Sequence, residues 1–157
     1  MDNNGFIKER KQPLLTGAGI LAVAAGLVLL YFGFFMLMDS NNSISPDLTV
    51  QQHKILKYLA IGGIYLMVNG GFSVVCGFYG AVNSGLVDNH RKCSIYGCVL
   101  LAFSVVNVLI MTLITDVAGN QFNIILLLVP ILIAVMYCLG AFLNQRMIQE
   151  RLKENES

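Results

Sequence analysis

Few residues of this chain could take part in catalysis. Asp88, His90 and Cys93 lie close together in the sequence, beside the basic pair Arg91 and Lys92. A carboxylate, an imidazole and a thiol that met at a membrane edge could act as base and nucleophile on a lipid substrate. Their spacing matches no recognised catalytic pattern. We therefore expect no catalytic residues and no enzymatic activity, with a lipid-directed enzyme as the weakest of three hypotheses.

Metal and cofactor sites are not predicted either. His53 and His90 each stand alone in a polar loop, with no second ligand at the spacing that a metal site needs. The other cysteines, Cys76, Cys98 and Cys138, form no Cys-x-x-Cys pair with one another or with Cys93. We expect no bound metal and no cofactor, because a buried cysteine usually behaves as a small apolar residue.

Cys93 has one further interpretation. It follows His90, Arg91 and Lys92 directly and begins an apolar stretch. A cysteine beside basic residues at the edge of a membrane span is a possible site of S-palmitoylation. The alternative is an unmodified thiol at the membrane interface.

Charge is distributed very unevenly along the chain. Of 157 residues, 56% are hydrophobic and only 12% are charged, and the mean hydropathy is +0.70. A soluble domain would carry about a quarter charged residues. Four stretches have no charged residue, and each exceeds the roughly 20 residues that cross a bilayer: Gln12 to Met38, Tyr58 to Val87, Cys93 to Thr115 and Asn120 to Gln145.

These stretches predict the fold. We expect an all-α membrane protein, a single domain over residues 1–157, with four transmembrane helices in an up-down-up-down bundle. The spans are placed at approximately 14–38, 55–82, 93–115 and 121–145, with a short cytoplasmic helical extension at 146–153. Pro13 suits the first turn of a helix, and Ser45-Pro46-Asp47 predicts a second helix start near Pro46. Pro130 should kink the fourth helix.

The basic residues predict the orientation. Most of them flank the ends of the spans that lie on one side of the membrane, and only Lys54 and Lys57 fall on the other side. By the positive-inside rule, both termini and the loop around Arg91 are cytoplasmic. The expected surroundings are the lipid bilayer and either further copies of the chain or another membrane protein, with no nucleic acid.

Small residues recur along the second span. Gly63, Gly70, Gly77 and Ser84 are spaced by seven, close to two helical turns. A bare helix face of this kind lets another helix approach closely in lipid. Further small residues, four apart, are Ser73 and Ala81 around Gly77, and Ala18, Ala22 and Gly26 in the first span. The stripe is either a dimerisation face or the seam against a helix of the same chain, and we favour the seam.

Two asparagines fall near the middle of the second and third spans. If these spans are antiparallel neighbours, Asn69 and Asn107 can lie at similar depth and form an amide pair, worth about 1 kcal/mol. The alternative is a polar lining for a solute path, to which Thr112 and the kink at Pro130 would contribute.

The second and third spans also carry a resemblance. Gly62-Gly63-Ile64-Tyr65, Gly70-Gly71-Phe72-Ser73-Val74, and Lys92-Cys93 with Gly97 resemble spans two and three of the membrane-spanning four-domain family A. Gly77-Phe78-Tyr79-Gly80-Ala81, followed by a short basic turn and a cysteine, is similar to the corresponding hairpin of tetraspanins, although the large disulfide-bonded outer loop of tetraspanins has no counterpart. Either resemblance implies a non-enzymatic organiser or modulator that forms oligomers.

The sequence therefore leaves two main hypotheses for the function. The first is a non-enzymatic membrane protein that acts through lateral helix contacts, as an oligomeric scaffold or as an accessory subunit. The second is a small channel or carrier subunit for a neutral or hydrophobic solute.

Overall fold

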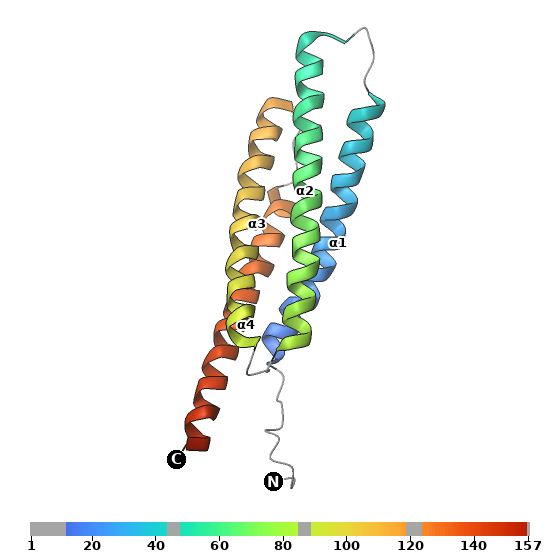
Figure 1. The fold of residues 1–157 in the computed structure, drawn as a ribbon. Coiled ribbons are helices and arrows are strands. Elements are labelled where there is room, and N and C mark those ends of the chain that lie inside the picture. The colour runs from blue at the N-terminus through green and yellow to red at the C-terminus, as the bar shows by residue number, and fades with distance from the viewer. Residues whose placement is uncertain (1–11, 44–47, 85–88, 119–123, 157) are drawn as a thin grey trace.

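Four long helices make up the described part of the chain. The computed structural model describes residues 12–43, 48–84, 89–118 and 124–156, and it contains no strand within these ranges (Figure 1). The helices are α1 (Pro13–Asn42), α2 (Val50–Asn83), α3 (His90–Ala118) and α4 (Ile124–Glu156). All four are long and apolar enough to cross a membrane, with mean hydropathies of 1.7 to 2.5 in their most apolar parts. This much of the predicted fold is confirmed.

The helix starts follow from local hydrogen bonds. α1 begins at Pro13, as predicted, and the side chain of Gln12 accepts a hydrogen bond from the backbone N–H of Leu15 at 2.6 Å. α2 begins at Val50 rather than near Pro46, which lies outside the described residues. Thr49 and Gln52 form a capping box there, since each side chain accepts a hydrogen bond from the backbone N–H of the other.

The helices pack as a ring in which each one packs most extensively against two neighbours. α1 and α2 make the most extensive contact, and α2–α3, α3–α4 and α1–α4 complete the ring. α1 starts and α4 ends at one end of the bundle, here called the terminal end, and α4 projects beyond the other helices there (Figure 1). An exposed ion pair between Arg146 and Glu150, with its two atoms 3.0 Å apart, lies in the C-terminal part of α4.

The contact between α1 and α2 is made by glycines on both helices. Gly19, Gly26 and Gly33 of α1 lie against Gly77, Gly70 and Gly63 of α2, respectively. These six residues are called the glycine seam. A Cβ atom added at Gly26 would lie 2.6 Å from the carbonyl oxygen of Gly70, and one added at Gly70 would lie 2.7 Å from that of Gly26. Because real Cβ atoms do not approach so closely, the two backbones are in direct contact only because glycine is present.

The seam fixes the relative position of the two helices. The three glycine pairs run in opposite sequence order, so α1 and α2 are antiparallel with a constant offset. At the terminal end, the Oγ1 atom of Thr16 and the Oγ atom of Ser84 share a 2.6 Å hydrogen bond across the same interface. Ala81 packs beside Gly19, where its Cβ lies 3.1 Å from the Cβ position of that glycine. Five small residues of α2 thus contact α1 of the same chain: Gly63, Gly70, Gly77, Ala81 and Ser84.

The alanines of α1 also pack against a second neighbour. Ala18 and Ala22 are buried in a cluster with residues of α4, among them Ala134, Tyr137 and Ala141. α4 in turn approaches α1 through Gly140, where a Cβ would lie 2.8 Å from the backbone of Leu15. α1 therefore packs against both of its neighbours through small residues. Its glycines contact α2 and its alanines pack against α4, and Ala22 also lies beside Gly77 of α2.

We expect Gly70→Ala to destabilise the protein, by about 1–3 kcal/mol, because the new methyl group would collide with the backbone of Gly26 and Leu30. Gly71→Ala is the matched control, since a Cβ there meets nothing within 4 Å and alanine favours a helix by up to about 1 kcal/mol. The measurement is the thermal unfolding midpoint in detergent. Equal midpoints for the two variants would contradict the role of the seam.

Candidate functional site

A layer of polar side chains crosses the interior of the bundle between α2 and α3. Asn69 and Ser73 of α2 and Ser104 and Asn107 of α3 are all buried, and both asparagines have an exposure of 0%. These four residues are called the polar layer. Within each helix they are three or four residues apart, so they lie on one helical face. Ser104 donates a hydrogen bond to the carbonyl oxygen of Leu100 at 2.9 Å.

The polar layer separates two apolar clusters. On the side of the terminal end lies a cluster that includes Leu100 and Tyr137. On the opposite side lies a smaller cluster of Leu29, Leu66, Met111 and Ile114. On each of α2 and α3, the residues that face into the bundle form a row along the helix, here called the inward-facing row. Each row is therefore apolar at both ends and polar in the middle.

Aromatic contacts fix the depth of the two asparagines. The rings of Phe72 and Phe103 stack with centroids 4.9 Å apart, so these residues mark one level of the α2–α3 pair. Asn69 precedes Phe72 by three positions in α2, and Asn107 follows Phe103 by four in α3. At a rise of about 1.5 Å per residue in antiparallel helices, both asparagines lie at the same depth to within about 2 Å.

The hydrogen bond expected between these amides is not formed. Neither the amide nitrogen nor the carbonyl oxygen of Asn69 or of Asn107 has a hydrogen-bond partner among the described residues. The predicted equal depth is present, but the predicted pairing is not. Equal depth is set by backbone register, whereas a hydrogen bond also requires the two amide groups to meet within about 3 Å in a suitable orientation.

Tyr137 of α4 closes the interior on the side of the terminal end. Its ring is fully buried, and its hydroxyl donates a 2.9 Å hydrogen bond to the carbonyl oxygen of Cys76. Glycines on two helices make room for the ring: a Cβ at Gly80 would lie 2.6 Å from its Cζ atom, and one at Gly97 would lie 3.1 Å from its Cδ1 atom. The tyrosine thus ties α4 to α2 and α3.

The position of Cys93 argues against its predicted lipidation. Its side chain has an exposure of 0% and belongs to the apolar cluster that contains Leu15 and Tyr137. Cys93 begins the inward-facing row of α3 that continues with Gly97 and Leu100, so its thiol points into the bundle. An acyl chain on that sulfur would not fit there without displacing the core. Cys98, by contrast, is exposed.

The structure describes only some of the other residues considered for chemistry. Asp88 lies outside the described residues, and the side chain of His90 is not described either. Thr112 is exposed and donates a hydrogen bond to the carbonyl oxygen of Val108 at 2.7 Å, so it does not line an interior path. Pro130 is inside α4 and buried. Among the described residues, no three His, Cys, Asp or Glu side chains are grouped in a way that could hold a metal ion.

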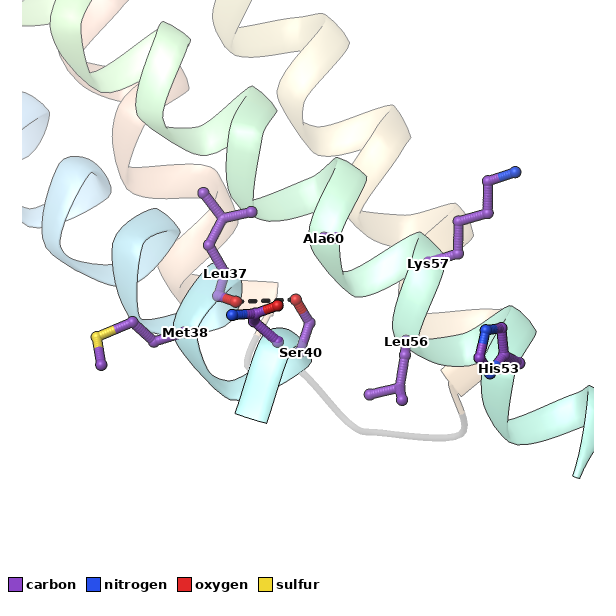
Figure 2. Close-up of a pocket in the computed structure, with 8 residues that line it drawn as sticks. Leu37, Met38, Ser40, His53, Leu56, Lys57 and Ala60 are labelled. Atoms are coloured by element: carbon purple, nitrogen blue, oxygen red, sulfur yellow. Dashed lines mark hydrogen bonds between the residues drawn. The ribbon is translucent and has the colours of Figure 1, made fainter. Parts of the chain in front are cut away.

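A groove of about 570 Å³ opens between α1 and α2 at the end opposite the terminal end (Figure 2). The next position after Gly33 in the seven-residue spacing of α1 is Ser40, and the next position before Gly63 in α2 is Leu56. Figure 2 shows these two residues on opposite walls of the groove. Leucine in place of glycine prevents backbone contact, so the helices separate. Ser40 is already bonded to the carbonyl oxygen of Leu37 at 2.9 Å.

Comparison with known proteins gives no match: no protein-family model, no curated protein and no solved structure is significantly similar to the chain. The resemblances to the membrane-spanning four-domain family A and to tetraspanins therefore stay predictions.

Three parts of this arrangement were not predicted from the sequence. Gly19 and Gly33 complete a seven-residue spacing with Gly26, the same signal that marks α2, and could have been found by comparing the two spans. Ser104 lies three positions before Asn107 and could have been placed on the same face. Tyr137 carried no recognisable signal, since only the packing of three helices around it shows its position.

We expect Gly80→Ala to destabilise the protein by about 1–3 kcal/mol, because the methyl group would meet the ring of Tyr137. The double variant Gly80→Ala/Tyr137→Leu should lose less stability than the two single variants added together, with a coupling of about 0.5–3 kcal/mol. Gly17→Ala, where a Cβ meets nothing within 4 Å, is the control. Additive losses in thermal unfolding would show that the ring does not occupy this slot.

Proposed function

We propose that the protein is a non-enzymatic integral membrane protein that acts through lateral contacts of its helices, as an oligomeric scaffold or as an accessory subunit of a larger membrane complex. Its four helices would cross the membrane in up-down-up-down order, with both termini on the cytoplasmic side. The clustering of basic residues near the chain ends and around Arg91 supports this orientation.

The observation that carries this proposal is the outward-facing surface of α1. In the most apolar part of α1, only 22% of the residues are buried within the bundle, whereas the corresponding share is 39% in α2 and in α4. Tyr31, Phe34, Phe35 and Met38 recur at the spacing of one helical face, and all are exposed. The ring of Tyr31 lies 6.1 Å from that of Phe35, measured between centroids.

These aromatic residues favour a protein neighbour. The seam against α2 leaves this face of α1 pointing away from the described part of the bundle, toward lipid or another membrane protein. Aromatic rings supply large, rigid contact area, and aromatic pairs add about 0.5–1.5 kcal/mol beyond the area that they bury. An aromatic anchor at the lipid headgroups is the alternative that an experiment must separate from a helix contact.

The assembly itself is tested by extraction from membranes in mild detergent, followed by mass measurement of the purified particle. We expect a particle larger than one chain with its detergent, made of several copies or of this chain with a second membrane protein. A chain that is strictly monomeric and free of partners would contradict the proposal.

We expect Phe35→Leu to weaken the association by between about twofold and tenfold, the equivalent of one lost aromatic contact. Phe142→Leu on α4 is the matched control, because Phe142 is 63% exposed and Phe35 is 60% exposed. Association is measured in liposomes by energy transfer between donor-labelled and acceptor-labelled copies, or with the partner found by extraction. If both variants associate like the unchanged protein, the aromatic face of α1 only contacts lipid.

A second candidate function, a small channel or carrier subunit for a neutral solute, is favoured by the two unpaired amides in the polar layer. It predicts that liposomes with the purified protein take up glycerol or urea faster than empty liposomes do. Asn69→Leu/Asn107→Leu should reduce that flux to the background, whereas Thr112→Val, on the exposed face, should not. Uptake equal to that of empty liposomes would remove this candidate.

A further inference from the structure

The polar layer contains hydrogen-bonding groups that the described chain does not satisfy. The amides of Asn69 and Asn107 together offer four N–H donors and two carbonyl acceptors, and none of these groups has a partner among the described residues. Both side chains have an exposure of 0%, so neither bulk water nor lipid headgroups can reach them directly. Polar groups buried in this way in proteins are almost always paired, with the protein or with bound water.

Small polar residues lie beside the two amides. On one side of the two amides, Leu66 and Met111 lie about one turn away. On the other side the next large side chains are farther away: Leu100 is about two turns from Asn107, and Tyr137 of α4 lies beside Gly80, about three turns from Asn69. In the polar layer itself, Ser73 and Ser104 take the place of such residues and bring two hydroxyl groups. A bound water needs two to four polar partners, and the polar layer supplies them.

The groups present favour a neutral ligand over an ion. No member of the polar layer carries a charge, and neither do the inward-facing residues next to it, Leu66, Cys76, Leu100 and Met111. An unpaired ion in such an apolar interior would be strongly unfavourable. A molecule that both donates and accepts hydrogen bonds matches the mixture of amide N–H, carbonyl and hydroxyl groups.

We propose that the polar layer is a binding site for water, in which bound water bridges the amides of Asn69 and Asn107 in the middle of the bundle, with Ser73 and Ser104 as further partners. The site is independent of the lateral contacts proposed above. Bound water explains why two asparagines at equal depth are not hydrogen-bonded to one another, because each amide is hydrogen-bonded to water instead.

The test is NMR of the unaltered protein in deuterated detergent. Valine labelled with ¹³C at the carbonyl and asparagine labelled with ¹⁵N together mark only three backbone amides, those of Asn69, Asn83 and Asn107, because only these asparagines follow a valine. Their side-chain NH₂ signals can then be assigned without any substitution. Asn83, which donates to the carbonyl of Tyr79 near the end of α2, is the reference for ordinary solvent contact.

We expect cross-peaks between water and the side-chain NH₂ groups of Asn69 and Asn107. The sign of these cross-peaks should be that of water bound for longer than a nanosecond. The side-chain NH₂ group of Asn83 should show no cross-peak of that sign. Direct cross-peaks between the two NH₂ groups without any water cross-peak would overturn the proposal and establish the amide pair instead. Absence of both kinds of cross-peak would overturn it as well, since the amides would then have neither partner.

Discussion

Direct contact between the backbones of α1 and α2 is the constraint on which the rest of the bundle depends. At Gly19, Gly26 and Gly33 on one helix and Gly77, Gly70 and Gly63 on the other, there is no space for a side chain. Packing this close increases dispersion contacts along the pair, which matters in lipid because the hydrophobic effect does not drive helices together there. The pairing also holds one helix at a fixed offset along the other, since a shift would place a glycine opposite a larger residue.

The fixed α1–α2 pair determines where the other inward-facing residues lie. With one face of α2 occupied by α1, the adjacent row from Gly62 to Gly80 must face α3 and α4, and this row carries Asn69 and Ser73. The corresponding row of α3 then brings Ser104 and Asn107 to the same depth, and Tyr137 of α4 closes the interior between Gly80 and Gly97. Where the glycine spacing ends, at Leu56, the pair opens into the groove of Figure 2.

Much of this fold is predictable from the sequence, for physical reasons. Long stretches without charge identify the four helices, because charged side chains are unfavourable in lipid, and the burial of Asn69 and Asn107 follows from their position in the middle of spans. The partner of the glycine stripe is harder to predict, because intramolecular and intermolecular contacts use the same small residues. Cys93 was placed at the membrane edge because it borders basic residues, whereas the inward-facing row that it begins puts its thiol in the core. The pairing of the amides depends on side-chain distances that spacing alone does not determine.

The claim that the seam joins two helices of one chain is tested most directly by solid-state NMR in lipid bilayers, on protein labelled with ¹³C only at glycine. We predict through-space cross-peaks between Gly26 and Gly70, Gly19 and Gly77, and Gly33 and Gly63. These cross-peaks should keep their intensity per labelled chain when the labelled protein is diluted with unlabelled protein. Cross-peaks that are absent, or that disappear on dilution because they join two copies, would contradict the account.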